Sequence, residues 1–102
     1  MIVKAEISID ILDQECSTEI LPNLAKFIID WKLIGYHLKL TTAEITAIDG
    51  DNRTVDEKRV GMLLKWREKL AFKATYQVLV QALLDCERAS DAIDVCKMIT
   101  HG

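Results

Sequence analysis

The sequence predicts an all-helical domain, and three observations support this expectation. The 102 residues include only 4 glycines and 1 proline, too few for the many tight turns that a β-sandwich of this length needs. Apolar residues recur at three- and four-residue spacing along most of the chain, which is the period of an amphipathic helix. Threonine-led capping boxes mark two helix starts. Together these patterns predict six helices in a compact bundle.

The first two expected helices cover residues 21–30 and 31–38. Pro22 cannot lie in the middle of a helix without loss of a hydrogen bond, so it marks either the first turn of the earlier helix or a break just before it. Gly35 lies inside the second helix, where glycine costs up to ~1 kcal/mol against alanine, so we expect a neighbouring helix to approach closely there. The expected inward-facing residues are Leu21, Leu24, Phe27, Ile28, Trp31, Ile34 and Leu38.

The next two helices each begin at a capping box, residues 41–44 and 54–57. In such a box a threonine hydroxyl accepts a backbone N–H while a glutamate three residues later reaches back. The shorter helix is expected to end at the turn-forming run 49–52, and the longer one to continue to about Phe72. The expected inward-facing residues are Ile45 and Ile48 in the shorter helix, and Val60, Leu63, Leu64, Trp66 and Leu70 in the longer.

Thr75 and Ser90 are the expected N-caps of the last two helices, of which the earlier runs to about Cys86. Their expected inward-facing residues are Tyr76, Leu79, Val80 and Leu83, then Ala92, Val95, Cys96 and Ile99.

Residues 1–16 are predicted to form an N-terminal arm or short extra helix, and residues 17–102 the helical bundle. Ile7, Ile9 and Ile11 alternate with polar residues, which favours an extended arm packed on the bundle. A short extra helix in the same segment is the alternative.

Composition limits the classes of partner and the cellular compartment that we expect for this protein. Basic and acidic residues are mixed and the net charge is −3, so neither nucleic acid nor an anionic membrane is an expected partner. No apolar run approaches ~18 residues, and the first residues lack a signal-peptide pattern, so we expect no membrane insertion. The 3 cysteines are an odd number and lie far apart in the sequence, which is a poor framework for disulfides. This fits reduced thiols and a cytoplasmic location.

No catalytic, cofactor-binding or metal site is expected. Cys16, Cys86 and Cys96, with His37 and His101, lack the close pairs that seed a zinc site. A nucleophilic cysteine needs a positioned base, and none stands beside Cys16 in sequence. There is no glycine-rich phosphate loop, so we expect neither an enzyme nor a small-molecule substrate.

Charges cluster by sign in the second half of the chain. The basic segment is the end of the longest helix with its following loop, and comprises Lys65, Arg67, Lys69 and Lys73. The acidic segment is the junction of the last two helices, and comprises Asp85, Glu87, Asp91 and Asp94. Either segment is compatible with a solvated face that keeps the bundle soluble. The alternative is protein binding, since opposite charge on two different faces favours head-to-tail contact that need not close.

Four motifs follow one another along the chain. They are Trp31-x-x-Ile34-Gly35-x-x-Leu38-x-Leu40, Glu44-Ile45-x-x-Ile48, Gly61-Met62-Leu63-Leu64-Lys65-Trp66 and Ala74-Thr75-Tyr76-x-x-Leu79-x-x-Ala82-Leu83. Their order and spacing resemble the second to fifth helices of the death domain, over about residues 20–99. Trp31 and Trp66 continue the apolar faces of their helices, so we expect both in the core rather than at a binding hot spot.

The resemblance implies that the bundle of residues 17–102 is a six-helix antiparallel Greek-key bundle of the death-fold type. It also implies a protein–protein interaction module for homotypic assembly, with itself or other death domains, as an adaptor or scaffold in intracellular signalling such as apoptosis or innate immunity. In one contact of this family, the fourth helix and the loop after it meet the region between the fifth and sixth helices, where the two charged segments fall. The alternative is a structural or autoinhibitory domain of a larger protein that does not oligomerise.

Overall fold

The structure is a computed structural model that describes residues 11–101 of the chain. Its elements in order are α2 (Leu21–Leu24), η1 (Ala25–Phe27), α3 (Trp31–His37), α4 (Thr42–Asp51), α5 (Val55–Leu70), η2 (Ala71–Lys73), α6 (Tyr76–Asp85) and α7 (Ala89–His101), where η denotes a 3₁₀ turn. The predicted all-helical fold class is therefore confirmed. Most of the predicted N-terminal arm or helix, residues 1–10, lies outside the described residues.

Threonine side chains start three of the helices, as the sequence predicts. Both capping boxes form completely: Thr41 Oγ1 accepts the Glu44 N–H at 3.1 Å and Thr54 Oγ1 accepts the Glu57 N–H at 3.1 Å, while each glutamate accepts the N–H of its own threonine. Thr75 Oγ1 accepts the Val78 N–H at the start of α6. These caps satisfy backbone donors that a helix start leaves without partners.

Two predicted helix ends are wrong by a few residues. The first helix is shorter than expected, because the α-helical turn of α2 tightens into η1 and the chain leaves helical geometry at Ile28. Conversely, α4 continues through Gly50 to Asp51, so the run 49–52 does not break it where expected. The break falls at Asn52, whose side-chain amide donates to the Ile48 carbonyl at 2.8 Å.

The expected cap at Ser90 is also wrong. The helix α7 begins at Ala89, so Ser90 lies within its first turn. The Arg88 carbonyl accepts the first helical hydrogen bond from the Ala92 N–H at 3.0 Å, and the Arg88 side chain pairs with Asp91 at 2.7 Å. This ion pair joins the start of α7 to the residue before it.

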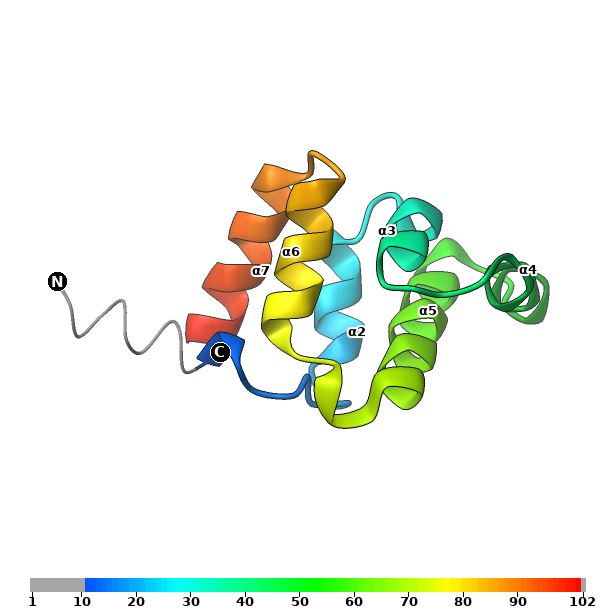
Figure 1. Cartoon of the computed structure of the whole chain (residues 1–102). Coiled ribbons are helices and arrows are strands. Elements are labelled where there is room, and N and C mark those ends of the chain that lie inside the picture. Colours follow the sequence, from blue (N-terminus) through cyan, green and yellow to red (C-terminus); the bar gives the residue numbers. More distant parts are fainter. Residues whose placement is uncertain (1–10, 102) are drawn as a thin grey trace, which may run out of the picture.

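The helices surround α5 and α2 (Figure 1). α6 and α7 lie side by side and antiparallel, while α3 and α4 lie on the opposite side of the bundle with α5. α2 and η1 pack against α5, and η1 also contacts α7. α5 therefore contacts α3 and α4 on its own side of the bundle and α2 with η1 in the middle, while η1 and α3 connect to the α6–α7 pair.

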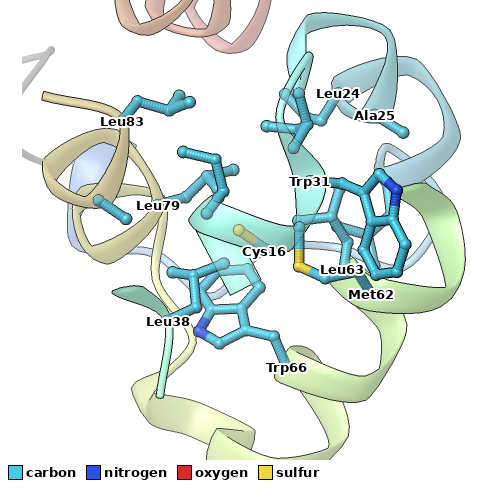
Figure 2. Packing of buried hydrophobic residues seen from close by; sticks show 14 of the residues in the cluster. Cys16, Leu24, Ala25, Trp31, Leu38, Met62, Leu63, Trp66, Leu79 and Leu83 are labelled. Atoms are coloured by element: carbon cyan, nitrogen blue, oxygen red, sulfur yellow. The ribbon is translucent and has the colours of Figure 1, made fainter. Parts of the chain in front are cut away.

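Side chains of α5 occupy the centre of the core (Figure 2). Met62, Leu63 and Trp66 are fully buried, and Trp31 of α3 is only 6% exposed, which confirms the core assignment of both tryptophans. Leu64 was expected inside but is 44% exposed. Met62 and Leu64 are the two sequence neighbours of the buried Leu63, and tertiary packing encloses Met62 rather than Leu64.

Gly35 permits the close approach that its position predicts. A Cβ atom at Gly35 would lie 2.6 Å from Ile45 Cδ1 and 3.2 Å from Met62 Cγ. Side chains from α4 and α5 thus fill the space beside the α3 backbone, and the packing offsets the helix-propensity cost of glycine.

We expect Trp66→Ala to lower the free energy of unfolding by about 3–5 kcal/mol, because it opens a cavity at the centre of the core. Trp66→Phe should cost less, since it keeps an aromatic ring and removes an indole N–H that has no acceptor among the described residues. Urea denaturation followed by circular dichroism measures both effects.

The matched control is Leu64→Ala on the exposed face of the same helix, with an expected change of about 0.5 kcal/mol or less. An unchanged urea midpoint for Trp66→Ala would contradict the central position of this side chain.

Candidate protein-interaction surfaces

Arg67 of the basic segment holds the chain before α2 against the end of α5. Its guanidinium donates to the Cys16 carbonyl at 2.5 Å, to the Ala71 carbonyl at 3.2 Å and to the Glu15 carboxylate at 2.7 Å. The side chain is 23% exposed. Tertiary structure therefore gives Arg67 a structural role that its position in the sequence did not reveal.

The segment that Arg67 holds is also bonded to the start of α6. The Cys16 N–H donates to the Ala74 carbonyl at 2.8 Å, and the Tyr76 N–H donates to the Gln14 carbonyl at 3.1 Å. Cys16 itself is fully buried. Residues 14–16 thus fasten the end of α5, the η2 turn and the start of α6 to one another.

Lys69 is likewise engaged within the chain. Its ammonium donates to the Lys39 carbonyl at 2.9 Å and to the Glu44 carboxylate at 2.8 Å, and so joins α5 to the connection between α3 and α4. The hydrogen bond from Lys69 lowers the pKa of Glu44 from 4.5 to about 2, with a further contribution from the Thr41 N–H.

The other two basic residues are more available to a partner. Lys73 lies exposed on η2. Lys65 is 40% exposed at its side chain and has a 3.9 Å contact with Glu68, one turn away on the same helix. A contact of this kind between exposed charges contributes little, so within residues 11–101 these two cations have no strong partner and can face another molecule.

The acidic segment divides in the same way. Asp91 is nearly buried, and Arg88 neutralises it at 2.7 Å. Asp85 is exposed and accepts a hydrogen bond from Gln81 at 2.9 Å. Glu87 is exposed in the α6–α7 turn with a left-handed φ of 61°, and Asp94 is half-buried on α7. Three carboxylates therefore remain at or near the surface at this corner.

The two charged segments lie at opposite ends of the bundle. In Figure 1 the end of α5 and the η2 turn are at the bottom, whereas the α6–α7 turn is at the top. The structure does not bring the two segments together within one molecule, so any contact between them requires a second molecule.

The cysteines are unsuited to nucleophilic chemistry. Burial raises the pKa of Cys16 to about 12, and the nearby Arg67 guanidinium offsets this only in part. Burial is also the main cause that raises the pKa of Cys86 and of Cys96. A thiol with a raised pKa is a poor source of thiolate at neutral pH.

The described residues contain no group of three or more metal-ligating side chains. Nor does any helix within residues 11–101 have the length and apolarity needed to cross a bilayer.

The sequence motifs and the bundle agree with a known family, since the family model of the death domain matches residues 18–100. The chain belongs to the death domain family. The match includes α7, which resembles that family in sequence only through its apolar pattern. A search of the solved structures finds no match. A death domain is a protein-interaction module rather than an enzyme, so exposed side chains, not a catalytic centre, are the features of interest in this death domain.

We expect Arg67→Leu to lower the free energy of unfolding of this death domain by about 2 kcal/mol, because it removes charge-assisted hydrogen bonds to two backbone carbonyls. Chemical denaturation measures the loss, and hydrogen exchange should show a faster-exchanging Cys16 amide. Lys65→Leu is the matched control on the same helix and should change stability by about 0.5 kcal/mol or less. Equal effects of the two substitutions would contradict the fastening role of Arg67.

The Glu44–Lys69 pair should make stability depend on acidity. The pKa of Glu44 in the folded domain, about 2, lies below its ordinary 4.5. Its contribution is therefore complete above about pH 4.5 and disappears as the pH falls toward about 2. We expect Glu44→Gln, which retains an acceptor for the Thr41 N–H, to reduce the decline in melting temperature across this range.

Lys69→Gln should flatten the same part of the profile, because it removes the main cause of the shift. Melting curves of the three proteins between about pH 6 and 2 provide the comparison. A Glu44→Gln profile that coincides with the wild-type profile would refute the pair's contribution.

Proposed function

We propose that this domain assembles homotypically with other death domains, either copies of itself or different members of the family. In this role it acts as an adaptor or scaffold in cytoplasmic signalling such as apoptosis or innate immunity. The observation that carries the proposal is the separation of exposed cations and exposed carboxylates onto opposite ends of a death domain.

Lys65 and Lys73 at one end, with Asp85, Glu87 and Asp94 at the other, are the proposed contact residues. Arg67, Lys69 and Asp91 contribute indirectly, because their bonds within the chain fix the backbone that carries these contact residues. Opposite charges on two different faces favour head-to-tail association, which can propagate without closing into a ring.

Charge alone is too weak for a stable assembly. Each exposed ion pair contributes at most ~1 kcal/mol and is screened by salt. The charged residues therefore steer and orient the contact, and neighbouring apolar side chains supply additional binding energy.

Charge reversal tests the contact. A Lys65→Glu/Lys73→Glu variant should raise the dissociation constant for self-association about tenfold, since two exposed ion pairs are lost. A second variant, Glu87→Lys/Asp94→Lys, should be equally impaired, and mixing the two variants should restore part of the association. Light scattering over a range of protein and salt concentrations measures these effects.

Lys26→Glu/Arg53→Glu is the matched control, because it makes the same change in net charge at exposed positions on other parts of the surface. Association that survives reversal of the contact residues, or that falls equally in the control, would disprove this contact. A wild-type domain that stays monomeric and does not bind other death domains would instead support the structural or autoinhibitory role.

A further inference from the structure

An apolar groove lies between α6 and α7 and has a volume of about 360 Å³. Val80 and Leu84 of α6 form one wall, and the other wall is formed by residues of α7, among them Ile93, Cys96, Lys97 and Thr100. Leu84 is 45% exposed and Ile93 is 54% exposed. Residues 11–101 therefore leave apolar surface uncovered along this groove.

The described chain begins at one end of the groove. The Gln14 carbonyl accepts the N–H of Tyr76, the first residue of α6, and Val80 lies about one helical turn further along α6. Because α6 and α7 are antiparallel, Thr100 in the last turn of α7 lies at this same end. Figure 1 likewise shows the start of the described chain at the end of the bundle where α7 finishes. We call this the near end of the groove, and the end beside the α6–α7 turn the far end.

Residues 1–10 are therefore joined to the fold close to the near end, and they are long enough to fill the groove. From Ile93 to Thr100 the α7 wall is about 10 Å long. Ten residues span about 15 Å as a helix and up to about 33 Å when extended. The segment can traverse the groove in either conformation.

The composition of the segment suits an apolar groove. Half of residues 1–10 are large apolar residues, namely Met1, Ile2, Val3, Ile7 and Ile9. The same character continues into the described chain, where Ile11 and Leu12 pack against the core. Burial of these side chains together with the exposed groove residues would remove apolar surface of both from water.

The charges of the segment follow the charges of the groove in order. Its two carboxylates, Glu6 and Asp10, lie nearer to the fold than its one lysine, Lys4. Lys97 lies about one turn from the near end of the α7 wall. Asp94 lies outside the lining, next to Ile93 at the far end. A segment that runs from the near end to the far end thus places carboxylates at Lys97 and its lysine toward Asp94.

We propose that residues 1–10 pack into the α6–α7 groove of their own molecule, with Ile7 and Ile9 as the apolar contact, and extend toward the acidic segment. The covalent connection holds residues 1–10 at a high effective concentration beside the groove, an advantage that a separate partner lacks. The consequence for assembly rests on the proposed function: the segment competes with a second molecule for the acidic end and restrains head-to-tail association.

Cys96 in the groove permits a direct test of the packing with the full chain. In an Ile9→Cys/Cys86→Ser variant, mild oxidation should form a disulfide between position 9 and Cys96 within one molecule. Cys16 does not compete, because it is fully buried. Non-reducing gels separate products within one molecule from products between molecules, and peptide mass mapping identifies the pair.

Thr18→Cys/Cys86→Ser is the matched control, since Thr18 is exposed and does not line the groove. The disulfide within the Ile9→Cys/Cys86→Ser variant should form about tenfold faster or more than any disulfide to Cys96 in this control. Equal rates would overturn the packing. A product found only between molecules would place the segment in the groove of a second copy and would also overturn the proposal.

The restraint on assembly has a separate test. Ile7→Ser/Ile9→Ser should lower the dissociation constant for self-association about tenfold, because it releases the groove and the acidic end. Light scattering measures the change. Val55→Ser is the control: it removes a side chain that is 51% exposed at the start of α5, and should associate as the wild type does.

The two tests separate the inference from the proposed function. If the disulfide forms within one molecule but Ile7→Ser/Ile9→Ser associates as the wild type does, the packing is supported and the restraint is refuted. If neither the wild type nor this variant self-associates, assembly of copies and its restraint fail together, while the disulfide still decides the packing.

Discussion

Burial of one face of α5 is the constraint on which the rest of the structure depends. Met62, Leu63 and Trp66 are fully enclosed, and α5 contacts α2, η1, α3 and α4. Because Trp66 points into the core, the side chain of the next residue, Arg67, is rotated by about 100° around the helix axis. It therefore reaches residues 14–16. Lys69 faces the α3–α4 connection for the same geometric reason. One buried face thus sets the direction of the charged side chains around it.

The charged residues therefore serve two purposes that sequence position does not distinguish. Some, such as Arg67 and Asp91, are partly buried and satisfy groups of their own chain. Others are exposed on turns. Glu87 itself has a left-handed φ, and Lys73 lies two residues after Ala71, whose φ is also positive. A charged residue that satisfies its own chain costs stability when it is removed, whereas a charged residue at an exposed turn can be changed with little effect on the fold.

The proposed contact combines weak elements that depend on one another. Ion pairs at the surface orient two molecules but bind them poorly, and an apolar insertion binds well but without direction. Exposed cations at one end of the domain and exposed carboxylates at the other supply the orienting charges, so apolar surface beside them has to supply the rest of the binding energy. This arrangement agrees with the apolar centre and polar rim of known interfaces.

The helical class, most helix starts and the burial of both tryptophans were predictable from the sequence. These depend on local chemistry, such as the Thr41 and Thr54 caps, and on apolar spacing. Motif order also identified the family. Tertiary structure alone decided that Met62 rather than Leu64 is enclosed, that Arg67 reaches a carbonyl 51 residues away, and that Phe72 is exposed. Those outcomes depend on which elements meet in space, and contacts between distant residues leave no period or spacing in a single sequence.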